Sequence, residues 1–529
     1  MSRIALIDLA ASDDATREER CQVCIVGAGA AGIYLARRLA ARGMSTLLVE
    51  AGGANCVMPE EIGFEADFAA DPYPGATQGR SFGLGGTTSR WGGLLFPHTE
   101  ADRRNPPEFE PDVWPRIIAD VAEFADDVLT HLRYGHGGEF RPFACRILGP
   151  AASALSDAGL LPGASLYLPF RAKNLATLLR RGFPGQANLR IVVNAVASSW
   201  SIAGGESPDG ARLRALTAIA PNGRRLEVTA DRFVISAGAI ESARMLLELN
   251  GRFAAPVIRR TAAIGAYLSD HLSLPMADVA PTDRKKAVRT FAPRFCRGWM
   301  RSFRFLELAP PPGPNRAYAH FIFDNTSAAF GVAKEVLTAL QARRRPKLTA
   351  GEVAAGIGGI AALAWGRYAR AALHVPTGTG VRLQLDIEQI PAAANRIELG
   401  PATDRFGRRR PVIHWRITAA DVTNMEATAR RVLESWRRAG ALYRGLPALL
   451  PRDLRAAAER PYDVYHPVGA CRMGEDAESV VDSNLRVWGV DNLWVVSTAV
   501  LPSAGTANPT FTMLCLAEGL ARRMTVPPA

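Results

Sequence analysis

Cysteine, histidine and long apolar runs are scarce in this sequence. Its seven cysteines cannot form an even set of disulfide partners, and Cys21 and Cys24 lie on one predicted strand, where they would point to opposite faces. A CxxC redox or zinc site is therefore not expected, and no other metal site is predicted. Reduced thiols are typical of cytoplasmic proteins. The most continuous uncharged apolar run, Val353–Gly366, is too short to span a bilayer.

The sequence also lacks a leader pattern, internal repeats and long low-complexity tracts. Acidic residues lie within and after the apolar stretch Ile4–Ala11, so the first twenty residues do not show the basic start and apolar core of a signal peptide. With 529 residues, 48% of them hydrophobic, the chain is long enough to bury large cores. We expect a globular, cytoplasmic protein of two intertwined domains.

A dinucleotide-binding motif opens the chain. The short apolar run Cys21–Val26 predicts a buried parallel strand, and a glycine-rich turn leads from it into the predicted helix Ile33–Arg42. Gly27 permits the tight turn, Gly29 lets backbone amides approach a pyrophosphate, and Gly32 lets the helix pack on the strand. The N-terminus of the helix then points at the phosphates.

The acid that ends the second predicted strand restricts the dinucleotide. Thr46–Val49 is followed by Glu50, eighteen residues after Gly32, where a carboxylate can accept hydrogen bonds from ribose hydroxyls and would repel a 2′-phosphate. Strand, turn, helix, strand and acid in this order favour a ligand site over a βαβ unit that binds nothing. The motif alone is compatible with both NAD and FAD.

Three later segments favour FAD. The loop Gly83–Gly93 is rich in glycine and lets backbone approach a large flat ligand, although an ordinary surface turn would have the same composition. Arg232–Leu247 repeats the order of strand, small-residue turn and helix. The third segment is the C-terminal block 465–510.

In this order, these segments resemble the glucose-methanol-choline (GMC) family of FAD-dependent oxidoreductases. The resemblance covers most of the chain and leaves 277–380 poorly matched. The matching runs are Gly27–Gly32, Glu50–Gly53, Gly85–Gly93, Val234–Leu247, Ile264–His271, Glu388–Pro391, Asn395–Arg396, His466–Gly469, Met473–Gly474, Asn492–Val495 and Ser503–Thr510. The last run resembles the bacterial sugar-oxidising branch, which includes pyranose oxidase-like enzymes, more than the choline or methanol branches.

The resemblance implies which residues hold the cofactor. They are Gly27, Gly29, Ala30, Ala31, Gly32, Glu50, Ala51, Gly86, Thr87, Arg90, Trp91, Gly92, Gly93, Val196, Ala237, Gly238, Ser497, Thr498, Pro509 and Thr510. Two of these positions depart from the family. Pyranose oxidases tether FAD through a histidine in the glycine-rich loop, and Arg90 stands at that position, which implies non-covalent FAD. Ser497 stands where many relatives have an aspartate, so the resemblance leaves one flavin contact of the family open here.

Oxidation of an alcohol needs a base near the flavin, because the hydroxyl proton leaves as hydride moves to flavin N5. A neutral imidazole can accept this proton near pH 7. The resemblance places His466 over the flavin as this base and implies that the Asn508 side chain binds the substrate oxygen. It gives His271 only the anchoring of a loop. From the sequence, Asn508 before Pro509 is also typical of a helix N-cap followed by the first helical residue, and both roles can coexist.

We therefore predict an α/β fold with a discontinuous Rossmann-type FAD-binding domain and a second, α+β substrate domain built on an antiparallel sheet. The FAD-binding domain is expected from 20–145, 185–276 and 462–529, and the substrate domain from 146–184 and 277–461.

Further strands are predicted from alternating or turn-bounded runs. Ala187–Ile202 and Arg212–Val228 are predicted as the strands of a β-meander, separated by a turn at 204–210. The strands of the substrate-domain sheet and the helix after them are predicted at Val381–Ile390, Asn395–Leu399, Val412–Arg416 and Ala419–Ala439.

Positive charge is concentrated in 277–373. This segment contains sixteen Lys and Arg against six Asp and Glu, a net charge of +10 out of +12 for the whole chain. It includes the basic run 343–347 ahead of the apolar run Val353–Gly366, and we expect it to stand apart from the flavin chemistry. A basic face exposed to solvent explains the pattern. The alternative is contact with an anionic lipid surface or an acidic electron carrier. Contact with lipid would make the protein peripheral to a membrane. Nucleic acid is not expected, because no binding fold accompanies the charge.

These features together predict FAD-dependent oxidation of a CH–OH group of an alcohol or sugar-like substrate, by hydride transfer to flavin N5 with His466 as base. A dehydrogenase is favoured over an oxidase, because no feature specifies the use of oxygen; the sequence does not name the electron acceptor. Two alternatives are a lyase of the same family that retains FAD and a non-catalytic flavin-binding protein. The presence of both His466 and Asn508 argues against the second.

Overall fold

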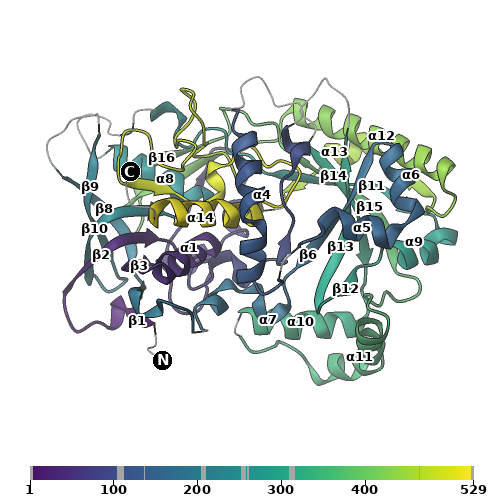
Figure 1. Cartoon of the computed structure of the whole chain (residues 1–529), viewed down its shortest axis with the longest axis horizontal. Coiled ribbons are helices and arrows are strands. Elements are labelled where there is room, and N and C mark those ends of the chain that lie inside the picture. The colour runs from purple at the N-terminus through teal and green to yellow at the C-terminus, as the bar shows by residue number, and fades with distance from the viewer. Residues whose placement is uncertain are drawn as a thin grey trace.

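Two large β-sheets organise the chain. The computed structural model describes residues 4–103, 112–135, 137–180, 182–203, 210–251, 258, 261–308, 316–342, 344–463 and 465–525. In Figure 1 the first sheet lies on the left and the second on the right, with helices packed around both. Arg343 and most of the turn predicted at 204–210 lie outside the described residues.

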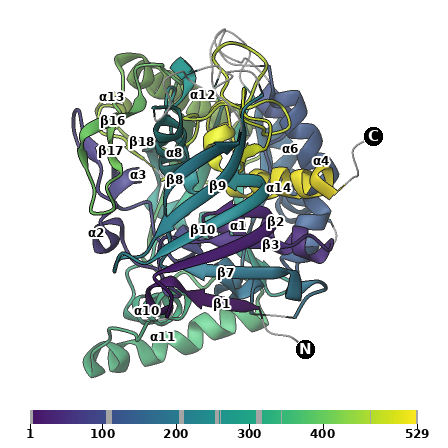
Figure 2. The same cartoon turned by 90° about the vertical axis from the view of Figure 1, so that its left-hand side faces the viewer.

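The first sheet is of the Rossmann type and has eight strands. In chain order they are β1 (Ala5–Asp8), β2 (Thr16–Val26), β3 (Thr46–Val49), β7 (Leu189–Val193), β8 (Val196–Ala203), β9 (Arg212–Ile219), β10 (Arg225–Ile235) and β20 (Leu493–Val495). Across the sheet the order is β1-β7-β3-β2-β10-β9-β8, and β20 pairs with β10. Five strands of this order, β1, β7, β3, β2 and β10, pair parallel with one another, and β20 pairs parallel with β10. The strands β9 and β8 pair antiparallel at the other edge (Figure 2).

Helices from distant parts of the chain pack together at this sheet, with the first on its strands, the last on the first, and the remaining one on the last. They are α1 (Ala30–Ala41), α4 (Trp114–His131) and α14 (Thr510–Thr525), and twelve of the sixteen residues of α14 are buried. Glu518 of α14 accepts ion pairs from Arg38 at 2.6 Å and Arg42 at 2.8 Å, so the last helix is fixed to the first. The two halves of the chain predicted to share one site therefore lie side by side.

The predicted β-meander is wrong in detail. The region 187–202 contains two strands, because Asn194 adopts a left-handed φ of +54° that ends β7 before β8 begins. The region 212–228 is likewise divided by a turn at Gly223, which has a φ of +86°. The strand after this turn, β10, ends at Ile235, so it includes the strand predicted at the start of Arg232–Leu247.

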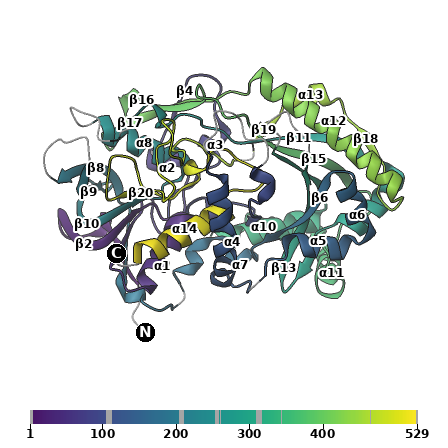
Figure 3. The same ribbon diagram turned by 45° about the horizontal axis from the view of Figure 1, so that its top comes forward.

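The second sheet is antiparallel and has nine strands. They are β5 (Leu94–Leu95), β6 (Leu160–Tyr167), β11 (His271–Val279), β12 (Arg294–Cys296), β13 (Trp299–Glu307), β14 (Ala317–Asp324), β15 (Gly380–Glu388), β18 (Leu449–Pro451) and β19 (Tyr462–Asp463). Figure 3 shows α12 (Ala419–Leu442) along the outer side of this sheet. Trp436 of α12 packs on Phe305 and Phe321, with ring centroids 5.6 and 5.4 Å apart. The predicted α/β fold with an antiparallel substrate sheet is confirmed.

Two strands assigned to the substrate sheet belong elsewhere. β16 (Arg396–Thr403) and β17 (Arg409–His414) form a separate three-stranded sheet with β4 (Asp67–Phe68). The sequence pattern indicates that these segments are strands but not which strands they pair with, and this explains why they were assigned to the wrong sheet. The domain boundaries given above remain proposals.

The other helices are α2 (Pro59–Ile62), α3 (Pro74–Thr77), α5 (Phe140–Leu148), α6 (Pro150–Asp157), α7 (Phe170–Lys173), α8 (Gly238–Gly251), α9 (Arg284–Phe291), α10 (Ala328–Ala342), α11 (Ala350–Ala369) and α13 (Leu454–Ala458). Of these, α8, α10 and α11 have 14 to 20 residues, and the rest have nine or fewer. Among the helices of the described residues, none is both long and apolar enough to cross a membrane.

Close packing in the first βαβ unit leads to a test of Gly32. A Cβ added at Gly32 would lie 1.9 Å from the carbonyl oxygen of Gly27, which is backbone and cannot move aside. Gly32→Ala should therefore lower the free energy of unfolding by about 1–3 kcal/mol, measured by denaturant unfolding. Gly440→Ala in α12 is the matched control, because its Cβ would meet nothing within 4 Å. Equal stability of the two variants would contradict the close-packing role of Gly32.

Candidate active site

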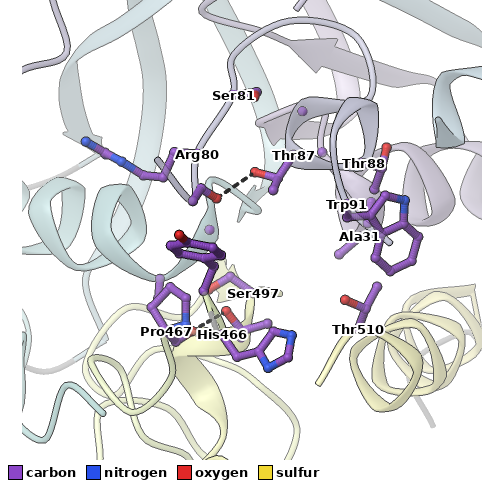
Figure 4. Close-up of a pocket in the computed structure, with 18 of the residues that line it drawn as sticks. Ala31, Arg80, Ser81, Thr87, Thr88, Trp91, His466, Pro467, Ser497 and Thr510 are labelled. Carbon is purple, nitrogen blue, oxygen red and sulfur yellow. Dashed lines mark hydrogen bonds between the residues drawn. The ribbon is translucent and has the colours of Figure 1, made fainter. Parts of the chain in front are cut away.

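A cavity of about 820 Å³ is lined by residues of both large sheets. The first sheet contributes the turns after β2 and β10, and the second contributes side chains of β13, β14 and β15. Figure 4 looks into this cavity, with Thr87 and Thr88 of the glycine-rich loop across from His466 and Pro467. The N-terminal and C-terminal segments singled out in the sequence therefore meet at one place.

Most predicted site residues line this cavity. They are His466, Asn508, Gly27, Gly29, Ala30, Ala31, Glu50, Ala51, Gly86, Thr87, Arg90, Trp91, Gly92, Ala237, Gly238, Ser497, Thr498, Pro509 and Thr510. Gly32, Gly93 and Val196 lie behind its wall. Val196 is fully buried between Ala195 and Ala197, which do line the cavity, because neighbouring side chains on a strand point to opposite faces.

Glu50 holds three loops of the cavity wall together. Its carboxylate accepts hydrogen bonds from the backbone N–H groups of Ala28 at 2.7 Å, Gly52 at 2.9 Å and Gly83 at 2.8 Å. Burial raises the pKa of this carboxyl, and the three amides act in the opposite direction by stabilising its charged form. The predicted contact of Glu50 with ribose hydroxyls stays a proposal; a structural role for its carboxylate was not foreseen.

The start of α1 fits the pyrophosphate of a dinucleotide. Its N-cap, Gly29, makes no side-chain capping bond, and the first turn contains no acidic residue. A Cβ at Gly29 would meet nothing within 4 Å, so the space in front of the helix is open. Backbone N–H groups at a helix N-terminus bind phosphate oxygens well. Ala30 and Ala31 line the cavity beside them.

Asp270 positions the backbone of both histidines near the cavity. Its Oδ1 accepts the N–H of His271 at 2.7 Å and the N–H of His466 at 2.8 Å, and its Oδ2 accepts the Tyr73 hydroxyl at 2.5 Å. One atom from each side chain of Asp270, His271 and His466 could ligate a metal ion, and these three atoms lie within 4.8 Å of one another. Because these atoms take part in hydrogen bonds, the group needs no metal ion to hold its arrangement.

The tautomer of His466 follows from its neighbours. The Nε2 of His271 lies 2.9 Å from the carbonyl oxygen of Gly505, which only accepts, so this nitrogen carries the proton. In neutral His271 the Nδ1 is then an acceptor, and it lies 3.2 Å from the Nδ1 of His466. His466 must therefore carry its proton on Nδ1, which leaves Nε2 with a lone pair.

Asn508 completes this chain of hydrogen bonds from the other side. Its Nδ2 lies 3.0 Å from the Nε2 of His466, and its Oδ1 accepts a hydrogen bond from the guanidinium of Arg304. Since Arg304 can only donate, the amide of Asn508 is oriented with its NH₂ toward His466. This orientation agrees with the lone pair assigned to His466 Nε2.

Both imidazoles are neutral at physiological pH. Burial lowers the pKa of His271 to about 4. Burial, and then the neighbouring His271, lower the pKa of His466 well below its usual range. His466 is thus held in the form that can accept a proton.

The predicted N-cap role of Asn508 is wrong. α14 begins at Thr510, so Pro509 precedes the helix, and the amide of Met513 bonds to the carbonyl of Pro509 at 2.9 Å. Within the described chain, the hydrogen bonds of the Asn508 side chain go to His466 and Arg304. The local sequence is typical of a cap, but the partners across the cavity decide its bonding.

The polar wall contributed by the second sheet was missed by the sequence analysis. It consists of Tyr167, Arg304, Tyr318, His320, Gln384 and Asp386. Their strands alternate buried apolar with polar residues, for example Leu383, Gln384, Leu385 and Asp386. Because the apolar side of this alternation packs under α12, the polar side faces the cavity. The period of two was visible in the sequence, but which face meets the cavity was not.

The wall also holds an ionised carboxylate. Burial opposes ionisation of Asp386, but His320, whose Nε2 lies 3.1 Å away, and the hydroxyls of Ser273 and Tyr318 lower the pKa of Asp386 well below its usual range. Asp386 therefore accepts hydrogen bonds at neutral pH.

The expectation that 277–373 stands apart from the flavin chemistry is wrong. Arg304, Tyr318 and His320 come from this segment and line the cavity. Arg301, Arg304 and Arg316 are 3% exposed or less, so part of the basic excess lies inside the protein. Charge counted along the sequence does not distinguish buried from exposed guanidinium groups.

Comparisons with known proteins agree with the motifs found in the N-terminal and C-terminal parts of the chain. A family model described as GMC oxidoreductase matches 391–517, and one described as FAD binding domain matches 20–65. The chain is 25% identical over 301 residues to 2-methyl-1,2-propanediol dehydrogenase of Mycolicibacterium austroafricanum, covering 56% of this chain and 48% of that protein. It is 32% identical over 123 residues to C-glycoside 3-oxidase of Arthrobacter globiformis, covering 23% and 22%. The matches thus span about half, or less, of these relatives.

A solved structure shares the fold over nearly the whole chain. The crystal structure of pyridoxine 4-oxidase from Mesorbium loti superimposes with a TM-score of 0.58 and 19% identity, covering 95% of this chain and 99% of the other. At this identity the likeness establishes the fold alone. The family models and the motifs make the chain similar to the GMC oxidoreductases over 391–517 and to FAD binding domains over 20–65, and its cofactor is FAD, bound non-covalently.

Proposed function

We propose that this protein oxidises a CH–OH group of a hydroxyl-rich, sugar-like alcohol, with His466 as the general base. The observation that carries the proposal is the lone pair on His466 Nε2, fixed by hydrogen bonds to His271 and Asn508 at the wall of the cavity. Bound FAD supplies the acceptor of hydride. The turn Gly27–Ala31 and the loop Gly86–Gly92 are the segments that would hold it.

His466 and its neighbours provide what proton removal requires. A substrate hydroxyl that replaces the Asn508 amide at His466 Nε2 donates its proton there, while Asn508 Nδ2 donates to the substrate oxygen. The imidazolium that results retains its donor bond from Nδ1 to His271. Arg304 keeps the Asn508 amide facing the reacting oxygen.

A hydroxyl-rich substrate is supported by unused hydrogen-bonding atoms in the wall. Arg304 Nη1 and Gln384 Oε1 are buried and have no hydrogen-bond partner among the described residues. Buried polar atoms are costly unless a partner satisfies them. One donor and one acceptor near the ionised Asp386 match hydroxyl groups, which both donate and accept. The names of the relatives, a diol dehydrogenase and a C-glycoside 3-oxidase, support the same class.

We propose a dehydrogenase rather than an oxidase, because no feature of the described residues is specific for oxygen. The names of relatives include both kinds. A lyase of the same family and a non-catalytic flavin protein are the alternatives. The oriented base argues against a protein that only binds flavin.

Anaerobic mixing with a panel of sugars, diols and simple alcohols tests the reaction. A substrate should bleach the absorbance of the flavin, and admission of oxygen should restore it slowly compared with an artificial acceptor. Fast reoxidation by oxygen would identify an oxidase. If no hydroxyl compound bleaches the flavin while a cyanohydrin is cleaved, the protein is a lyase.

Removing the base should slow the reductive step. We expect His466→Ala to retain FAD and to reduce its flavin roughly 10²–10⁴-fold more slowly, as measured by anaerobic stopped flow. Asn508→Ala should slow flavin reduction about 10- to 100-fold, which corresponds to the loss of one hydrogen bond to a charged group. Because Asn508 does not cap α14, this variant should not lose a helix cap. His414→Ala is the matched control, because His414 is a partly exposed histidine of β17 outside the cavity wall. Near-normal reduction in His466→Ala would remove this residue from the mechanism.

The rate of reduction should also depend on pH in a defined direction. Protonated His466 cannot accept a proton, so the rate falls as pH falls through the pKa of this imidazole. Because burial lowers that pKa, the acid limb should lie below the ordinary imidazole value of about 6.5. The limb should disappear in His466→Ala. An acid limb at or above the ordinary value would show that another group limits the reaction.

A further inference from the structure

Helices α10 and α11 form a hairpin at one edge of the molecule. In Figures 1 and 2, which differ by a quarter turn, α11 lies at the lower edge of the protein. Glycines let the two helices approach closely, since a Cβ at Gly359 would lie 2.5 Å from the Cβ of Ala329. Of the twenty residues of α11, only Gly356 and Gly366 are buried. The side of α11 that faces away from α10 is therefore uncovered by the described chain.

The uncovered side is strongly apolar. Val353, Ile357, Ile360 and Tyr368 follow one another at intervals of four, three and eight residues, which places them on one stripe of the helix. Ile357 is 64% exposed, Tyr368 is 82% exposed, and the neighbouring Trp365 is 63% exposed. Of the twelve large apolar side chains that are strongly exposed in the described chain, six lie on this hairpin. Monomeric soluble proteins rarely expose such a cluster without a binding role.

Positive charge stands at both ends of this stripe. No charged residue occurs between Val353 and Gly366. Arg345 and Lys347 are exposed just before α11, and Arg370 is exposed just after it. The acids of the hairpin are already engaged: Glu335 binds Arg344 and the N–H of Lys347, and Glu352 caps α11 with Thr349.

We propose that α11 docks in the plane of an anionic lipid bilayer. Its apolar stripe would enter the boundary between headgroups and acyl chains, and the basic residues at its ends would contact lipid phosphates. Trp365 and Tyr368 suit this boundary, because each has an apolar ring with one polar atom. A second copy of the chain fits less well, since pairing two such hairpins would bring like charges together. A nucleic acid offers nothing to cover the apolar stripe.

The docking surface is connected to the cofactor loop. Gln341, in the last turn of α10, donates hydrogen bonds at 3.0 Å to the carbonyl oxygens of Thr88 and Trp91. Both residues line the cavity. The hairpin is thus fixed beside the cavity, yet its exposed stripe shares no residue with the cavity wall.

Flotation with lipid vesicles tests the proposal on the FAD-loaded protein. It should bind vesicles that contain phosphatidylglycerol better than vesicles of phosphatidylcholine alone, and salt should weaken the binding because exposed charges are screened within about 10 Å at 0.1 M. Combined Arg345→Gln, Lys347→Gln and Arg370→Gln should lower the affinity roughly 100-fold. The matched control, Arg437→Gln with Arg444→Gln and Arg460→Gln, makes the same charge change at exposed positions on and after α12 and should bind normally.

Insertion of the stripe is tested separately. Lipids brominated on their acyl chains should quench part of the tryptophan fluorescence of the protein, and Trp365→Phe should remove that quenching. Ile357→Ser with Tyr368→Ser should weaken binding even at low salt. All variants should keep their FAD content and their rate of reduction by a soluble substrate.

Several outcomes would overturn the proposal. They are absence of binding to anionic vesicles at low salt, equal loss of binding in the control variant, and quenching that persists in Trp365→Phe. A dimer of the wild-type protein that dissociates in the Ile357→Ser and Tyr368→Ser variant would assign the stripe to a second copy instead.

Discussion

Buried carboxylates that accept backbone N–H groups hold the loops around this cavity together. A loop that lines a buried cavity must satisfy its amides without a sheet or helix, and carboxyl oxygens can accept their hydrogen bonds. Glu50 joins the loops at Ala28, Gly52 and Gly83, and Asp270 joins the backbones of His271 and His466. Asp102 accepts the N–H and hydroxyl of Thr506 in the same way. Side-chain geometry at the cavity depends on these fixed backbones.

Fixed backbones allow a hydrogen-bond network with only one consistent arrangement of protons. The carbonyl of Gly505 at one end only accepts, and the guanidinium of Arg304 at the other end only donates. Every group between them must follow, so His466 has its lone pair on Nε2. Burial strengthens this result, because it keeps both imidazoles neutral. In the reaction that we propose, a base oriented before the substrate binds would lower the cost of reorganisation.

The basic segment serves two different purposes. Its strand β13 places Arg304 against Asn508, where the buried cation orients the amide and keeps one nitrogen without a hydrogen-bond partner among the described residues. Its helical hairpin carries exposed cations around an apolar stripe. The same residue type is therefore buried and hydrogen-bonded at the cavity and exposed at the surface, where we propose that it attracts anionic lipid.

The sequence by itself determined the cofactor half of this protein. The Gly27–Gly32 turn and Glu50 are local patterns whose geometry depends on neighbours in the chain, and the family motifs placed His466 and Asn508 at one site. Only the tertiary structure decided the bonding of Asn508, the role of Arg304 and which face of each second-sheet strand meets the cavity. These features depend on contacts between residues far apart in sequence, such as the 204 positions between Arg304 and Asn508. Propensity and periodicity describe a segment, whereas burial and hydrogen-bond partners are properties of the folded whole.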